Sequence, residues 1–223
     1  TTTLRRQTVV NDVNPPTTPD LHIIDHVKSS LDITVERPTI PGNHNIVNDI
    51  ALPITASKAV TDSLANVTNA KQVTIVTDSS SCSGGLTELL ASQPHLRVVD
   101  SIQYVEENIL PKLSITKVRS VALHPTCSTT SMGINGSLTN LAKAIADEVF
   151  IPENWGCCAF AGDRGMTFPE LTASATSLQA TEIKDREDAF FISANRTCEI
   201  GMSKATGKKY RHILEVLEDM ATP

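Results

Sequence analysis

The stretch Val118-Arg-Ser-Val-Ala-Leu-His-Pro-Thr-Cys127 passes from an apolar, β-branched run directly into a cysteine. Its apolar part predicts a β-strand over 118–123, because short runs of this composition bounded by turn residues are typical of buried strands. Similar short runs recur along the chain and are separated by longer amphipathic segments, which predict helices. Such an alternation is typical of an α/β layer architecture.

The predicted elements fall in the same order in each half of the chain. Strands are expected over 8–10, 33–36, 72–77, 97–99, 118–123, 148–151 and 189–193. Helices are expected over 19–30, 54–69, 84–92, 101–112, 132–146, 168–184, 199–206 and 209–221.

Short internal repeats support a duplication. Pro38-Thr-Ile-Pro-Gly42 aligns with Pro152-Glu-Asn-Trp-Gly156 without a gap, and 73–82 aligns with 189–198 at nearly the same offset. Self-similarity at a period of about 115 residues usually means two copies of one fold packed about a pseudo-twofold axis. We therefore expect two α/β lobes, over 1–114 and 115–223.

Four of the five cysteines form one pattern in the second half: Cys127, the adjacent pair Cys157 and Cys158, and Cys198. Thiolate is the soft ligand that selects iron–sulfur clusters and zinc, and four thiolates can hold a [4Fe–4S] cluster or a tetrahedral zinc. Adjacent cysteines rarely form a disulfide with each other without strain, yet both can turn toward one metal. The pattern favours a redox metal site. A Cys₄ zinc site and four unconnected buried thiols stay open as alternatives.

The position of these cysteines supports a common site. Three of the four follow predicted strands, and loops at the carboxyl ends of an α/β sheet meet in one crevice. The aligned positions of the first half carry Asn43 and His44 in place of the cysteine pair. We therefore expect the second lobe to hold the metal and the first to act as a cysteine-depleted scaffold.

Composition narrows the function classes. The 223 residues are 40% hydrophobic, with a formal net charge of −6 and a pI near 5.5, which argues against a nucleic-acid partner because phosphate binding needs a basic face. No apolar run approaches the roughly 18 residues of a membrane span, and the Thr-rich start does not resemble a signal peptide. We expect a cytoplasmic protein whose cysteines are metal ligands or free thiols. The first residue is Thr, which leaves open that the chain is a piece of a longer polypeptide.

Cys82 is the one cysteine of the first half, in Asp78-Ser-Ser-Ser-Cys-Ser-Gly-Gly85. It could reach the metal from the first lobe as a further ligand. Alternatively, this polar stretch is a turn that caps a helix starting near Gly84. The turn is favoured, and ligation by Cys82 stays open.

Charged side chains near the cysteines are candidate cofactor-binding residues. Arg164 and Arg196 could stabilise an anionic cluster and raise its reduction potential, or could be ordinary surface residues. His124 and His44 could be ligands, but a histidine that follows a strand is more commonly a hydrogen-bonded structural residue. We therefore keep both histidines outside the predicted ligand set.

The quoted motifs resemble a known family. The spacing of the four cysteines resembles the cysteine-rich CCG domain of heterodisulfide reductase and glycolate oxidase subunits. Five segments are similar to the C-terminal end of FAD-linked, iron–sulfur D-lactate dehydrogenases: His124-Pro-Thr-Cys, Gly156-Cys-Cys-Ala-Phe-Ala-Gly-Asp-Arg-Gly, Pro169-Glu-Leu-Thr-Ala-Ser-Ala-Thr, Asn195-Arg-Thr-Cys-Glu-Ile-Gly-Met and Tyr210-Arg-His-Ile-Leu-Glu-Val-Leu-Glu. The similarity is dense from about residue 117 to 221 and thin before residue 70.

The resemblance implies an electron-transfer module. It would carry electrons from FAD, held in a domain or subunit outside this chain, to a quinone or other acceptor, with peripheral membrane contact through its partners left open. Nothing in these residues resembles an FAD-binding fold, so the chain has no complete active site of its own. Ala159 stands where the motif has its naming glycine, and Gly201 stands where some relatives carry a further cysteine, so a five-cysteine site is not expected.

Overall fold

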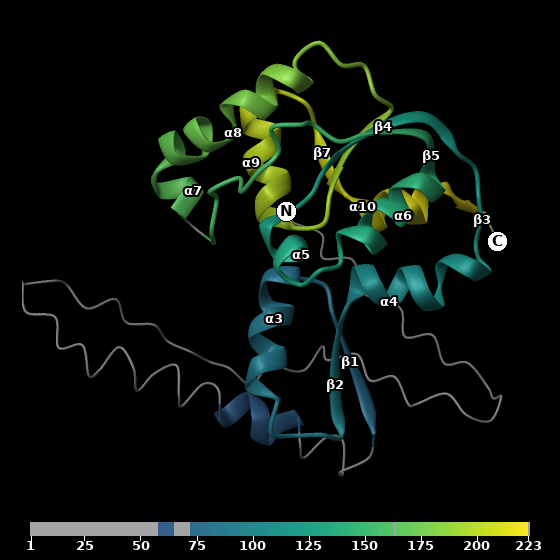
Figure 1. Ribbon diagram of the computed structural model, residues 1–223, viewed down its shortest axis with the longest axis vertical. Coiled ribbons are helices and arrows are strands. Elements are labelled where there is room, and N and C mark those ends of the chain that lie inside the picture. The colour runs from purple at the N-terminus through teal and green to yellow at the C-terminus, as the bar shows by residue number, and fades with distance from the viewer. Residues whose placement is uncertain (1–57, 65–71, 163, 223) are drawn as a thin grey trace, which may run out of the picture.

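The computed structural model describes residues 58–64, 72–162 and 164–222 (Figure 1). The predicted strands over 8–10 and 33–36, the predicted helix over 19–30 and His44 lie outside the described residues.

A four-stranded parallel sheet forms the centre of the C-terminal part of the chain, in the order β5-β4-β6-β7. Its strands are β4 (Val118–His124), β5 (Ala146–Phe150), β6 (Phe190–Ser193) and β7 (Tyr210–His212). In the register of the sheet, Val121 of β4 lies opposite Val149 of β5 and Phe190 of β6. The predicted α/β class with parallel strands is confirmed.

Helices cover both faces of this sheet (Figure 1). Because successive residues of a strand point to opposite faces, Val121 and Leu123 pack on one side of β4 and Ala122 packs on the other. The first face is covered by α4 (Ser101–Asn108), α6 (Asn135–Ile145) and α10 (Ile213–Met220). The second face is covered by α8 (Pro169–Ile183) and α9 (Arg196–Thr206).

A smaller parallel pair lies beside the main sheet. It consists of β1 (Val73–Thr77) and β2 (Leu96–Asp100), with α3 (Ser80–Leu89) and a helix over 58–64 beside it. A short 3₁₀ turn (Leu110–Lys112) leads from α4 to β3 (Ser114–Ile115), which pairs antiparallel with β8 (Ala221–Thr222) near the end of the chain.

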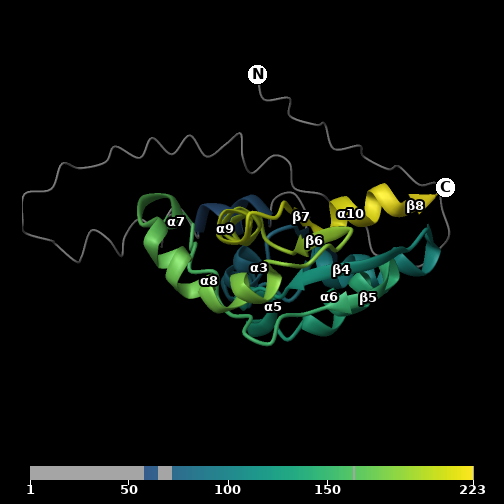
Figure 2. The same ribbon diagram turned by 90° about the horizontal axis from the view of Figure 1, so that it is seen from above.

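Both views place α5 (Cys127–Ser131) beside α3 (Figures 1 and 2). Since most of the first lobe is not described, the internal duplication stays a prediction.

The end of the chain departs from the predicted single helix over 209–221. Residues 210–212 instead form β7, which pairs parallel with β6, and α10 begins only at Ile213. The ring of Tyr210 is buried against Phe191, with 5.7 Å between centroids. The charged stretch Lys208-Lys-Tyr-Arg-His212 looks locally like a helix start, but pairing with β6 makes residues 210–212 a strand.

The ion pair between Arg186 and Asp188 secures the second face of the sheet. Nε and Nη2 of Arg186 donate to the two carboxylate oxygens of Asp188 at 2.6 and 2.8 Å, and the guanidinium lies 3.7 Å from the ring centroid of Phe150. Burial alone would raise the pKa of the Asp188 carboxyl, but hydrogen bonds from Arg186 and Ser120 hold it below 3.8. The bonded carboxylate therefore stabilises the fold at neutral pH, and this contribution is lost as the pH falls through the lowered pKa.

We expect Asp188→Asn to lower the free energy of unfolding by about 1.5–3 kcal/mol at pH 7, the usual worth of hydrogen bonds to a charged group. Urea unfolding should show this difference shrinking as the pH falls through the lowered pKa of Asp188, because the folded wild-type carboxyl becomes protonated over that range. Asp219→Asn is the matched control, since Asp219 pairs with Arg211 at the surface and should change stability by about 0.5 kcal/mol or less. Equal losses in the two variants would contradict the assigned role of Asp188.

Candidate metal centre

Three neighbouring strands each lead into a cysteine at the same edge of the sheet. Cys127 is the first residue of α5, which follows β4. Cys157 and Cys158 lie in the loop between β5 and α7 (Arg164–Thr167). Cys198 lies in the first turn of α9, after β6. Because β4, β5 and β6 are parallel, their carboxyl ends bring these segments to one crevice.

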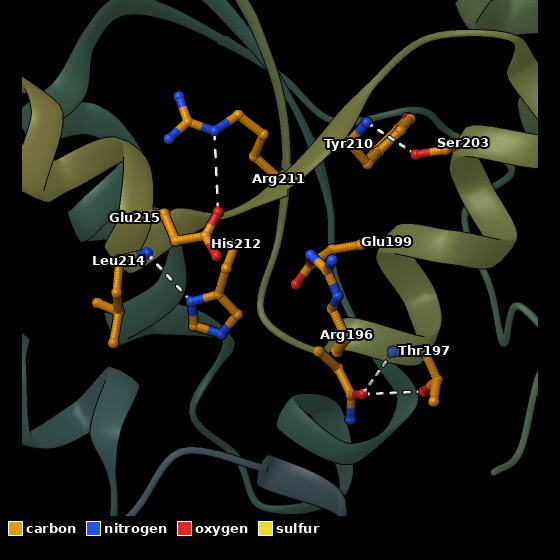
Figure 3. A network of polar contacts seen from close by, with 10 residues as sticks. Arg196, Thr197, Glu199, Ser203, Tyr210, Arg211, His212, Leu214 and Glu215 are labelled. Carbon is orange, nitrogen blue, oxygen red and sulfur yellow. Dashed lines mark hydrogen bonds and ion pairs between the residues drawn. The ribbon is translucent and has the colours of Figure 1, made fainter. Parts of the chain in front are cut away.

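Polar side chains start the helices that carry Cys127 and Cys198. The hydroxyl of Thr126 accepts from the backbone N–H of Thr129 in a capping box at the start of α5. The side-chain oxygen of Asn195 accepts from the backbone N–H of Thr197 at 3.2 Å at the start of α9 (Figure 3). These bonds satisfy N–H groups that a helix start leaves free. They therefore fix where each helix begins, and with it the place of its cysteine.

The loop that carries the adjacent cysteines has an unusual backbone. Ala159 and Ala161 have φ angles of 52° and 38°, and Gly162 has a φ of 69°. Left-handed conformations cost a residue with a Cβ roughly 1–2 kcal/mol, whereas glycine adopts them freely. The glycine that names the motif would therefore suit position 159 sterically, and the alanine here adopts the same turn at some cost.

Phe160 packs this loop onto the helices around it. Its ring is fully buried and clusters with Cys158 and Cys198. A Cβ built on Gly165 would lie 2.4 Å from the ring, and one on Gly201 would lie 3.2 Å from it. The absence of side chains at both glycines is therefore what lets the ring sit beneath the cysteines.

A cavity of about 350 Å³ opens at this edge, and all four predicted cysteines line it. Asn195, Arg196 and Thr197 line it from the start of α9, and Asp78 and Ser79 line it from the end of β1. A volume of this size is in the range of pockets that hold small molecules or cofactors. The predicted clustering of the four cysteines in space is therefore found.

The sulfurs form two pairs that differ in exposure. Sγ of Cys158 and Sγ of Cys198 lie 3.2 Å apart and are buried, whereas Cys127 and Cys157 are exposed. At 3.2 Å the inner pair is hydrogen-bonded and not a disulfide, whose S–S length is about 2.05 Å. The hydrogen bond between them lowers the pKa of Cys158, which His124 lowers further, whereas the same bond and burial raise the pKa of Cys198. Burial and the neighbouring Cys157 raise the pKa of Cys127.

This arrangement suits a thiophilic metal. Four sulfurs converge on one cavity, and removing each proton would leave like charges side by side. A metal cation offsets such repulsion, and thiolates are the ligands that iron–sulfur clusters and zinc select. The residues present therefore fit either group.

His124 joins the inner pair of cysteines. A ring nitrogen of His124 and the sulfurs of Cys158 and Cys198 all lie within 4.8 Å of one another, and all three residues are buried. The expected hydrogen bond of a structural histidine is also present, because Nδ1 contacts the side-chain amide of Gln179. In the sequence, His124 stands three residues before Cys127 at the end of a predicted strand, and this position was the signal that it could lie near the cysteines.

The other predicted residues are divided between the cavity and its surroundings. Arg196 lines the cavity and pairs with the buried carboxylate of Glu199 at 2.9 Å (Figure 3). Burial raises the pKa of Glu199, and Arg196 opposes that shift.

Two other predicted residues, Arg164 and Cys82, lie outside the cavity lining. Arg164 is exposed at the start of α7, and Cys82 is exposed within α3. Asp78 and Ser79, between β1 and α3, also line the cavity, although the sequence predicted them only as part of a turn.

Comparison with known proteins agrees with this site. Residues 121–203 match the CCG family model, described as a cysteine-rich domain, so the predicted resemblance to the CCG domain is confirmed. The chain is 25% identical over 125 residues to the "Glycolate oxidase iron-sulfur subunit" of Escherichia coli (strain K12). That match covers 54% of this chain and 30% of the relative, so the chain spans less than a third of the relative's length.

Among solved structures, glutamate racemase isoform RacE1 from Bacillus anthracis is similar in part. It is 12% identical, with 91% of this chain and 70% of the racemase covered, at a TM-score of 0.35. A similarity at this level carries no inference about function.

Proposed function

We propose that this chain is an electron-transfer module that holds one cysteine-ligated iron–sulfur cluster, of the [4Fe–4S] type, at the carboxyl edge of its parallel sheet. The ligands would be Cys127, Cys157, Cys158 and Cys198. A bound cluster supplies a site that takes up and releases single electrons. The chain's own residues position the sulfurs and control the access of water and partners.

The convergence of the four sulfurs on one cavity carries this proposal. They come from three separate segments of the chain, yet all four line the same 350 Å³ space. Unrelated buried thiols would have no reason to meet in this way, and two of the four are in fact exposed. The iron–sulfur subunit named in the comparison supports iron–sulfur chemistry over other thiol chemistry.

The unequal exposure of the sulfurs suits electron exchange with a partner. Cys158 and Cys198 lie on the protein side of the cavity, at 3% and 4% exposure, while Cys127 and Cys157 lie on its solvent side. A cluster held between them would be shielded on one side and approachable on the other. Arg196, which is largely exposed at the cavity wall, would add a positive charge next to an anionic cluster.

The wider context is also part of the proposal. We infer that the electrons come from FAD in a separate domain or subunit that oxidises D-lactate or a related D-2-hydroxy acid, and pass to a quinone or another acceptor. None of the helices within the described ranges is long and apolar enough to cross a membrane. Any membrane contact of this part of the chain would therefore be made at its surface or through partners.

A structural zinc site is the second candidate, and one observation favours it. His124, Cys158 and Cys198 form a buried donor set of mixed nitrogen and sulfur, and such sets are common in structural zinc sites. In that case the centre would stabilise the second lobe and the chain would serve assembly with a flavoprotein.

Metal and sulfide analysis of protein purified without oxygen distinguishes the iron–sulfur cluster from the structural zinc site. We expect about four irons and four acid-labile sulfides per chain, with broad brown absorption. One zinc without sulfide would overturn the electron-transfer proposal in favour of the structural one. Protein isolated without metal would be reconstituted with iron and sulfide, and failure to take them up would also overturn it.

A further inference from the structure

The two inner sulfurs of the site are placed to bond to each other. Sγ of Cys158 and Sγ of Cys198 lie 3.2 Å apart and are hydrogen-bonded. A disulfide bond is about 2.05 Å long, so forming it requires a movement of roughly 1 Å shared between two side chains. The two residues are 40 positions apart in the chain, so it is tertiary packing that brings them together.

Buried contacts hold the pair in this arrangement. Cys158 and Cys198 are 3% and 4% exposed, and they form one apolar cluster with the fully buried ring of Phe160. Ile200 packs against the same cluster. Two reactive groups that the fold holds side by side react as if each were present at a very high local concentration. The packing therefore favours a bond between these two sulfurs.

The other cysteines are less suited to such a bond. Cys157 is adjacent to Cys158, and neighbouring cysteines rarely form a disulfide without backbone strain. Cys82 is exposed within α3 and lies outside the cavity lining. Cys127 and Cys157 are hydrogen-bonded to each other, but both are exposed to solvent. The inner pair is thus the one that is both in contact and buried.

We propose that Cys158 and Cys198 form a reversible disulfide when the chain meets a peroxide, and that this bond prevents metal binding at the site. A disulfide sulfur is no longer a thiolate, and the thiolate is the form that binds metal. The disulfide itself requires no metal, whereas its effect on metal binding rests on the proposed function. The bond would also keep both sulfurs from oxidation to sulfinic and sulfonic acids, which thiol reductants do not reverse.

The reaction needs a two-electron oxidant that is small enough for the cavity, and hydrogen peroxide is such an oxidant. Both sulfurs line the cavity. One sulfur attacks a peroxide oxygen and the O–O bond breaks, which gives a sulfenic acid and one water. The second sulfur attacks the sulfenic sulfur, so that the S–S bond forms and the hydroxyl leaves as a second water. The two thiol protons end in the waters, and a dithiol reductant reverses the reaction by thiol–disulfide exchange.

Disulfide mapping of the metal-free chain tests the bond directly. The chain is treated with hydrogen peroxide, its remaining thiols are alkylated, and its tryptic peptides are analysed by mass spectrometry. Trypsin leaves the four cysteines of the site on three peptides, which are 120–143 with Cys127, 144–164 with Cys157 and Cys158, and 197–204 with Cys198. We expect a cross-link between 144–164 and 197–204, with two of the five thiols lost and both restored by dithiothreitol.

Two serine variants identify the sulfur that reacts, because Cys157 and Cys158 share one peptide. The cross-link should persist in Cys157→Ser, the matched control, and disappear in Cys158→Ser. The opposite result would overturn the proposal, and so would a cross-link between 144–164 and 120–143 in place of the expected one. Fragment ions that separate the two adjacent cysteines give the same assignment in the unmutated chain, so the test does not depend on the folding of a variant.

Metal binding by the oxidised chain tests the effect of the bond. Zn²⁺ alone is the probe of the thiolates, because the sulfide needed to build a cluster would itself reduce a disulfide. The reduced chain should bind one Zn²⁺, and the oxidised chain should lose this binding until dithiothreitol is added. Equal Zn²⁺ binding by the two forms, at any level, would overturn the proposed effect on the site.

The outcomes distinguish this inference from the proposed function. A cross-link at another pair of cysteines, or no cross-link, would overturn the disulfide and leave the electron-transfer module intact. A cross-link between Cys158 and Cys198, in a chain that takes up no iron and sulfide once it is reduced, would support the disulfide and overturn the electron-transfer module.

Discussion

A Cys158→Ser variant is expected to lose essentially all of its iron and sulfide. Sγ of Cys158 is 3.2 Å from Sγ of Cys198 and belongs to the same buried donor group as His124. A serine hydroxyl is a hard and weakly acidic donor that iron–sulfur centres bind poorly, and the hydrogen bond that lowers the pKa of Cys158 would be lost with the sulfur. The measurement is iron and acid-labile sulfide per folded chain after purification or reconstitution without oxygen.

Cys82→Ser is the matched control for this experiment. Cys82 is exposed within α3 and does not line the cavity. This variant should keep the full metal and sulfide content, and circular dichroism of both variants should show the same helix content as the unmutated chain. Equal metal loss in the two variants would show that Cys82 belongs to the ligand set, and full retention in Cys158→Ser would remove Cys158 from it.

Phe160→Ala is expected to cause the second large loss, in folding stability and in metal affinity. The ring is fully buried, and the backbones of Gly165 and Gly201 approach it so closely that a Cβ on either would crowd it. Truncating a buried phenylalanine to alanine typically costs about 3–5 kcal/mol, because the surrounding structure only partly fills the space. Here the ring is also the contact that holds Cys158 beside Cys198. The variant should therefore lose both stability and metal affinity.

Urea unfolding of the reduced, metal-free chain measures the loss of folding stability. Titration with metal measures the loss of metal affinity. Phe168→Ala is the control, since Phe168 is 50% exposed and should change stability by about 0.5 kcal/mol or less. A loss under about 1 kcal/mol in Phe160→Ala would mean that the loop repacks without the ring. In that case the loop backbone alone, without the ring of Phe160, would position Cys157 and Cys158.

Much of the fold follows from local patterns. The predicted strands over 72–77, 97–99, 118–123, 148–151 and 189–193 all have counterparts within a few residues. They are short apolar runs, and in β4 and β6 alternate residues fill two different cores, as expected for a parallel sheet covered on both faces. The strand over 210–212 was wrongly predicted as helix, because its three residues form a strand only by pairing with β6.

The sequence predicted which cysteines lie together, but it did not predict the other residues that line the cavity. The four cysteines could be grouped because three of them follow strand ends, and the resemblance of their spacing to the CCG domain was confirmed by the family match. Sequence could not show that Asp78 and Ser79 line the same cavity, because they lie between β1 and α3, almost 50 residues before Cys127. It also could not separate Arg196, at the cavity wall, from Arg164, which is exposed outside it.

By itself, the sequence determined the α/β class, the chemical type of the donors and the strand ends at which the cysteines lie. These features depend on local propensity, periodicity and the affinity of thiolate for soft metals. Only the tertiary structure decided which two sulfurs are buried, that Phe160 packs against them, and that Gln179 contacts His124 from 55 residues away. Contacts of that kind depend on how helices cross the sheet and which glycines admit a ring, and no local stretch of sequence contains that geometry.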